Sequence, residues 1–131
     1  MVDFLSVIVA AIVGFIICAI YYGALFGKAW KRLSGIKHGR PPWHVYIIDI
    51  LALIIVAYVL GIFIDYVALP TLGVIPWTMG LYLGFLVWLG FIATTTLGMV
   101  TWERKPFSLW LLTNICSLIS FAVMGIILAV W

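Results

Sequence analysis

Four long apolar runs fill almost all of this chain, and they constrain its fold more than any other feature of the sequence. They cover residues 4–27, 44–69, 77–101 and 108–131. Each run reaches the ~20 residues that a helix needs to cross about 30 Å of hydrocarbon. Apolar residues make up 67% of the chain and charged residues 8%, whereas soluble domains carry about 45–50% and about 25%. The sequence therefore predicts an all-α polytopic membrane protein, a four-transmembrane-helix bundle that forms a single domain over residues 1–131.

The basic residues indicate how such a bundle would be oriented. All seven Lys and Arg residues fall within residues 28–40 and 104–105. Because Lys and Arg in short loops stay on the cytoplasmic side, both stretches are expected inside, and both termini and the 70–76 turn outside. A protein inserted in two orientations would show little such bias. We therefore expect an N-out, C-out topology in the cell membrane.

The basic segment 28–43 between the first two runs is expected to lie on the membrane surface. A net charge of +3 could indicate nucleic acid, but these residues adjoin a membrane helix, so attraction to anionic headgroups explains them better. The segment is expected to continue as a short interfacial helix until Gly35 and Gly39. A partner-docking role is the alternative. The expected headgroup contacts are Lys28, Lys31, Arg32, Lys37 and Arg40.

Polar side chains from all four runs fall at one depth. Counted from the helix centres at ~1.5 Å per residue, they lie about 8–11 Å on the cytoplasmic side of the midplane. They are Tyr21, Tyr22, Asp49, Thr94, Thr95, Thr96 and Asn114. An ionisable residue at membrane depth is a functional candidate, and this layer could bind a proton, a cation or a polar substrate group. The alternative is that hydrogen bonds between helices, worth about 0.6 kcal/mol each, hold the bundle together.

Other reactive side chains give weaker indications. Cys18 and Cys116, in the first and last runs, both fall about 4–5 Å on the cytoplasmic side of the midplane, so they could be neighbours. We interpret them as free thiols that pack as small apolar residues, because a redox pair would normally show a sequence motif or exposure. Asp65 faces nearly the opposite side of its helix from Asp49 and is expected at the outer aqueous boundary or in a pair across a dimer.

The sequence contains no recognisable catalytic constellation. It has no Gly-rich phosphate loop, nucleophile elbow or paired Cys motif. His38 and His44 lie near no cluster of Cys, Asp or Glu, so they are a weak indication of metal binding. We therefore expect no enzymatic activity, no metal and no cofactor.

Small residues recur at every fourth position in several runs, which lets helix backbones approach closely. The third run carries two offset stripes, so one of them could face a second copy of the chain. Homo-oligomerisation therefore stays open. The stripes are Ala10, Gly14 and Cys18 in the first run, Gly80 and Gly84 followed by Gly90, Thr94 and Gly98 in the third, and Gly125 and Ala129 in the fourth.

Several short motifs along the chain carry a resemblance to a known family. They are Tyr21-Tyr22, Leu25-Phe26-Gly27-Lys28-Ala29-Trp30, Gly90-Phe91, Trp102-Glu103-Arg104-Lys105-Pro106 and the closing Gly125-Ile126-Ile127-Leu128-Ala129-Val130-Trp131. In their order and spacing they resemble an uncharacterised prokaryotic family of small four-helix integral membrane proteins, a domain of unknown function. The resemblance covers nearly the full chain. It implies the fold and a place in the prokaryotic cytoplasmic membrane, but the family has no settled activity to transfer.

Two functional hypotheses follow from these features. The leading one is a non-enzymatic integral membrane protein that packs with itself, with lipid or with another membrane protein. The alternative is a small oligomeric transporter or channel that uses the inner polar layer around Asp49, with Tyr21, Thr95 and Asn114 as coordinating groups. A membrane enzyme acting on lipid would need a catalytic pair that the sequence does not contain.

Overall fold

Four helices that are long and apolar enough to cross a membrane make up the structure. The computed structural model describes residues 3–35, 42–72 and 76–131, and no strand occurs within these ranges. The four helices span Phe4–Leu25, Trp43–Val67, Trp77–Thr101 and Phe107–Val130. They follow the four apolar runs closely. The prediction of an all-helical chain with four potential membrane spans is therefore confirmed.

Three of the four long helices consist of shorter pieces, joined by π-helical turns. The first contains α1 (Phe4–Ile20) and the π-helical turn η1 (Tyr21–Leu25), and α2 (Gly27–Ser34) follows it. The second contains α3 (Trp43–Phe63) and η2 (Ile64–Ala68), followed by α4 (Leu69–Leu72). The third contains α5 (Trp77–Val87), η3 (Trp88–Ala93), α6 (Thr94–Thr96) and α7 (Gly98–Thr101). Only α8 (Phe107–Val130) is continuous.

The helix boundaries have local causes in the sequence. Each of α3, α5 and α8 begins directly after a proline in extended conformation, which suits a residue with fixed φ and no N–H to donate. The prolines are Pro42, Pro76 and Pro106. At the start of α1, the side chain of Asp3 accepts a hydrogen bond from the Leu5 N–H at 3.1 Å, as an N-cap residue does. At the end of α2, Gly35 adopts a left-handed conformation with φ 77°, which ends a helix at little cost.

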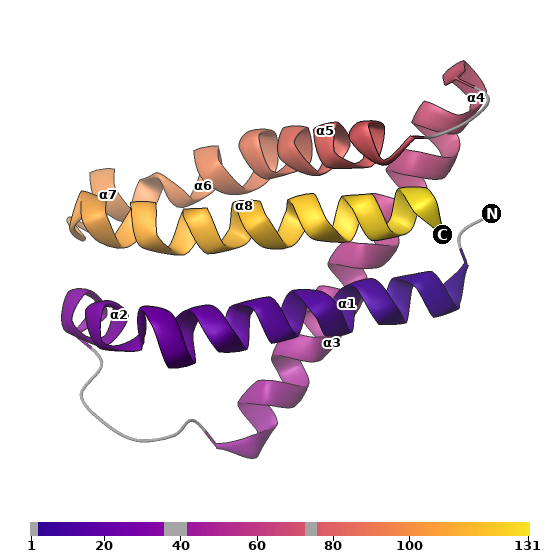
Figure 1. Cartoon of the computed structure of the whole chain (residues 1–131). Helices are drawn as coiled ribbons and strands as arrows, with labels where there is room; N and C mark the ends of the chain where they lie inside the picture. Colours follow the sequence, from indigo (N-terminus) through magenta and orange to yellow (C-terminus); the bar gives the residue numbers. More distant parts are fainter. Residues whose placement is uncertain (1–2, 36–41, 73–75) are drawn as a thin grey trace.

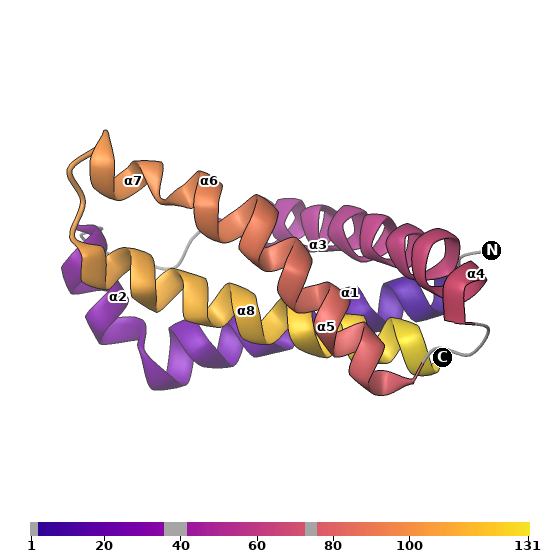
Figure 2. The ribbon, with the colours of Figure 1, turned by 90° about the horizontal axis from the view of Figure 1, so that it is seen from above.

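α8 lies at the centre of the bundle. It runs between α5 on one side and α1 on the other, while α3 crosses the bundle obliquely (Figures 1 and 2). The start of α1 and the end of α8 lie at one end of the bundle, which we call the terminal end. α2 and the turn before α8 lie at the opposite end, which we call the basic end (Figure 1).

The apolar core is built from α1, α3, η2 and α8. Its buried members are Val7, Ala10, Ala11, Ala57, Leu60, Ile64, Met124 and Leu128. On α3 and η2 these residues all fall in the second half of the helix. The first half of α3 is different: residues 43–49 are all exposed. α3 therefore joins the bundle toward the terminal end and leaves it toward the basic end (Figure 1).

α5 and α8 meet backbone to backbone through glycine. A Cβ built on Gly84 would collide with the main-chain carbonyl oxygen of Phe121, and one built on Gly80 would collide with that of Gly125. The stripe of Gly80 and Gly84 thus packs inside the bundle. The offset stripe does not, because Gly90 and Thr94 are exposed and nothing lies within 4 Å of a Cβ built on Gly90.

The basic side chains at the start of the segment that connects the first two long helices are exposed. Lys28, Lys31 and Arg32 on α2 are exposed. The predicted end of this helix at Gly35 is confirmed. The other two expected headgroup contacts, Lys37 and Arg40, lie outside the described residues, as do His38 and Gly39.

The glycine contact yields a stability prediction. Gly84→Ala should destabilise the protein by about 1–3 kcal/mol, because the added methyl forces α5 away from α8. The matched control is Gly90→Ala, which meets open space and should be neutral or stabilising by up to about 1 kcal/mol, since alanine favours the helix. Thermal unfolding in detergent, followed by circular dichroism, measures both. Equal melting temperatures for the two variants would contradict the close α5–α8 contact.

Candidate functional site

Tyr21 fastens the first helix to the last. It belongs to η1, is 5% exposed, and its hydroxyl donates a hydrogen bond to the Leu112 carbonyl of α8 at 2.6 Å. Its ring packs against Phe26 and, edge-on, against Tyr22, with centroid distances of 4.7 and 5.2 Å. The Tyr21 hydroxyl therefore has its hydrogen-bond acceptor within the bundle.

Asn114 joins the last helix to the third. It is 2% exposed; its side-chain amide donates to the Thr96 hydroxyl of α6 at 3.1 Å and to the Trp110 carbonyl of its own helix at 2.9 Å. The Thr96 hydroxyl also lies 2.6 Å from the Ile92 carbonyl. An interhelical hydrogen bond of this kind stabilises a helix pair in lipid.

Thr94 and Thr95, the other predicted members of the third helix, are exposed. Thr94 donates to the Gly90 carbonyl at 2.8 Å, and Thr95 donates to the Phe91 carbonyl. Hydroxyl groups that bond back to the preceding turn compete with the main-chain N–H groups and bend helices. These bonds coincide with the change from η3 to α6, which accounts for the irregular helix there.

Asp49 stands apart from the other polar groups. It lies in the exposed first half of α3, and no hydrogen bond reaches its carboxyl group from the residues that the structure describes. It is within electrostatic range of Cys18 on α1. The structure therefore brings Tyr21 to α8 and Asn114 to Thr96, but it links Asp49 by hydrogen bond to neither.

The two cysteines lie side by side between α1 and α8. Both are free, and their sulfur atoms are 3.6 Å apart. Ser120 Oγ is also 3.6 Å from Cys18 Sγ, and Tyr22 lies beside Cys116. The prediction that the thiols could be neighbours is confirmed. Sequence reasoning missed Ser120, although its position one helical turn after Cys116 places it on the same face.

The remaining candidates lie toward the two ends of the α3–η2 helix. Asp65 is a half-buried residue of η2. His44, in the first turn of α3, is exposed, and its ring lies edge-on to that of Trp43 at 6.1 Å. Across residues 3–35, 42–72 and 76–131, no three His, Cys, Asp or Glu side chains gather where they could hold a metal ion.

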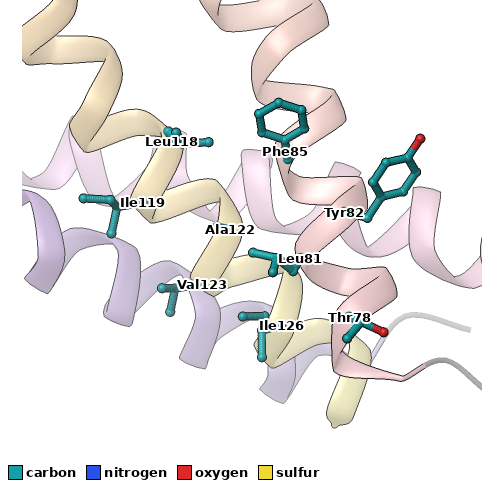
Figure 3. Close-up of a pocket in the computed structure, with 9 residues that line it drawn as sticks. All are labelled: Thr78, Leu81, Tyr82, Phe85, Leu118, Ile119, Ala122, Val123 and Ile126. Carbon is teal, nitrogen blue, oxygen red and sulfur yellow. The ribbon is translucent and has the colours of Figure 1, made fainter.

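The described residues form at least two grooves on the faces of the bundle. The larger, about 580 Å³, runs between α5 and α8 (Figure 3). Its lining residues are Thr78, Leu81, Tyr82, Phe85, Leu118, Ile119, Ala122, Val123 and Ile126. The smaller, about 410 Å³, is lined entirely by apolar residues of α3, α5, η3 and α8. Both are open to one side, so they suit apolar groups from the surroundings better than an enclosed polar solute.

Comparison with known proteins places the chain in a family. A family model described as a protein of unknown function, DUF1761, matches residues 5–129. No curated protein and no solved structure matches the chain. The expected resemblance to an uncharacterised family is thereby confirmed.

The bond between α6 and α8 can be tested with a double-mutant cycle. Thr96→Val and Asn114→Ala should show a coupling free energy of about 0.6–1.7 kcal/mol, which lies between the average and the maximum measured for such bonds in a membrane protein. The control cycle pairs Asn114→Ala with Thr95→Val, whose hydroxyl bonds only within its own helix, and should give coupling near zero. Unfolding free energies in mixed micelles measure both cycles. A Thr95 coupling as large as that of Thr96 would contradict the interhelical bond.

Proposed function

We propose a non-enzymatic role in the membrane for this chain, which belongs to the DUF1761 family of proteins of unknown function. The proposed role is the lateral binding of another transmembrane helix. The observation that carries the proposal is the first half of α3, which leaves the bundle and bears an exposed carboxyl group at Asp49. Four helices of sufficient length and apolarity support a multi-pass membrane protein. Its expected location is the prokaryotic cytoplasmic membrane.

The chemistry of the exposed half-helix supports binding. Exposed apolar side chains are favourable in lipid, so Ile48 and Leu51 by themselves do not require burial against a partner. A carboxyl group at this depth is different, because a charged side chain in hydrocarbon is costly and pairs with other groups or faces water. Since no described residue of the chain donates a hydrogen bond to Asp49, a partner helix with a donor would satisfy it.

A second copy of the chain is the partner that the surface suits best. The exposed stripe that begins at Gly90 and Thr94 lets another helix backbone approach closely. The groove between α3 and η3 offers about 410 Å³ of apolar space beside it. Other membrane proteins and lipid chains are the competing occupants of the same face. Lys28, Lys31 and Arg32 at the basic end would meanwhile contact anionic headgroups.

An oligomeric transporter or channel is the second candidate, and the same exposure of Asp49 favours it. Within one chain, Tyr21 and Asn114 make hydrogen bonds inside the bundle, so they offer few unbonded polar groups to a solute. A path would instead form between copies, with Asp49 lining it. Lateral association is common to both candidates, and charge-dependent flux separates them.

The proposed orientation places the basic end in the cytoplasm. Lys28, Lys31 and Arg32 belong to α2, and Arg104 and Lys105 lie between α7 and α8. α2 and the turn before α8 both lie at this end, away from the start of α1 and the end of α8 (Figure 1). Trypsin should therefore cut after the exposed Arg104 in inverted membrane vesicles but leave right-side-out vesicles intact. Mass spectrometry of the fragment that begins at Lys105 measures the cut. Cleavage in intact right-side-out vesicles would refute the N-out, C-out topology.

Asp49→Asn tests the binding surface. The substitution keeps the shape of the side chain and removes its charge, so we expect an unchanged melting temperature and a several-fold weaker association between copies. Energy transfer between labelled chains, measured while lipid dilutes them in proteoliposomes, reports association. The matched control is Asp65→Asn toward the terminal end of the same helix, which should leave association unchanged.

The remaining outcomes decide between the candidates. Loss of cation or proton flux in Asp49→Asn, with association intact, would favour the transporter. A protein that stays monomeric at every lipid ratio would rule out self-association.

A further inference from the structure

We propose that Cys18 and Cys116 form a reversible disulfide that joins the first and last transmembrane helices inside the apolar layer. The inference goes beyond the proposed function and shares with it only the membrane location. It concerns the contact between α1 and α8, whereas the proposed binding surface lies on α3, η3 and α6.

The geometry of the two thiols carries the inference. The chain has two cysteines, they come from helices that pack directly against each other, and their sulfur atoms are 3.6 Å apart. A disulfide bond is about 2.05 Å long, so the sulfurs need to approach by roughly 1.5 Å. Cys116 is 1% exposed and Cys18 is half-buried. One thiol is thus held inside the bundle while the other stays within reach of a reagent.

The surroundings of the pair are more polar than packing requires. Ser120, itself 3% exposed, lies 3.6 Å from the Cys18 sulfur and can hydrogen-bond to it. Tyr22 lies beside Cys116. Hydroxyl groups that contact both sulfurs orient them in both redox states, because a hydroxyl can donate to a sulfur as well as accept from a thiol.

The depth of the pair determines the kind of oxidant. Water-soluble thiol reagents do not enter hydrocarbon, so the electron acceptor is lipid-soluble, and we assign it to the quinones that dissolve in membranes. In the reaction both S–H bonds break and one S–S bond forms. The two electrons and two protons pass to the quinone, which becomes the quinol. The reverse reaction needs a separate lipid-soluble thiol reductant, which is itself oxidised as it returns two electrons and two protons to the sulfurs, because the reduction potential of a disulfide is too low for a quinol to reduce it.

The linkage would restrain the whole bundle. It joins residues 98 positions apart in the chain, close to the point where Tyr21 already bonds to α8. Oxidation would therefore lock the α1–α8 contact covalently, and reduction would leave it to packing and hydrogen bonds. The pair is thus a modification site through which the redox state of the membrane could change how firmly α1 is held to α8.

Proteolysis offers a direct test. Trypsin cuts after the exposed Lys31 and Arg32 and after Arg104, which separates α1 from α8 and places one cysteine on each fragment. The protein is reconstituted in nanodiscs containing a fully substituted benzoquinone, free thiols are alkylated in denaturant, and the digest is analysed by mass spectrometry without reductant. We expect the two fragments as one linked species that a reductant separates. Replacing quinone by quinol should abolish it.

Variants and controls keep the result interpretable. Cys18→Ser and Cys116→Ser should each lose the linked species. The matched control combines Cys116→Ser with Ile119→Cys, which moves the thiol to an exposed position of α8 in the α5–α8 groove. It should not link to Cys18. Linkage in this control as complete as in the native chain would overturn the proposal, because it would reflect unspecific oxidation.

Two further results separate this inference from self-association. Mixing isotope-labelled and unlabelled chains should give linked fragments of one label only, since the bond forms within a chain. Mixed-label species would overturn the intrachain assignment. A native protein whose two thiols remain fully alkylatable after exposure to quinone would overturn the proposal, whatever the outcome for Asp49.

Discussion

The backbone contact between α5 and α8 is the interaction on which the rest of the structure depends. In lipid no hydrophobic driving force brings helices together, so their association relies on close packing and a few hydrogen bonds. Gly80, Gly84 and Gly125 remove the side chains that would keep the two backbones apart. With α5 seated on one side, α8 presents its opposite face to α1. The central position of α8 thus follows from the absence of three side chains.

The two ends of the bundle differ in how they are held. Toward the terminal end, α1, α3 and α8 share an apolar core that includes Ala10, Leu60 and Met124. Toward the basic end, polar contacts take over, and α8 makes them in two directions, to Tyr21 and to Thr96. α3 takes no part in these hydrogen bonds. The first half of α3 keeps an edge-on ring contact between Tyr46 and Phe15 of α1 at 6.4 Å, but its residues 43–49 are exposed, because its buried core residues all lie in the second half.

This division separates the two proposals physically. The proposed lateral binding surface belongs to α3, η3 and α6, where the described residues leave side chains such as Asp49 and Thr94 exposed. The thiol pair belongs to the α1–α8 contact, where the two sulfurs already touch. Cys18 lies on the α1 helix that also contacts α3, and Asp49 is within its electrostatic range. Covalent fixation of α1 could therefore influence the binding surface without forming part of it.

The sequence by itself determined the number of membrane-length helices, the starts of three of them after Pro42, Pro76 and Pro106, and the clustering of basic residues. These properties are local, since they depend on hydropathy and on a rise of ~1.5 Å per residue. Only the tertiary structure decided that Asp49 is exposed, that Thr94 and Thr95 bond to their own helix, and that Cys18 meets Cys116. These outcomes depend on the rotation and crossing of each helix. In a chain that is apolar on all faces, side-chain periodicity does not identify the inner face, so packing between distant residues decides it.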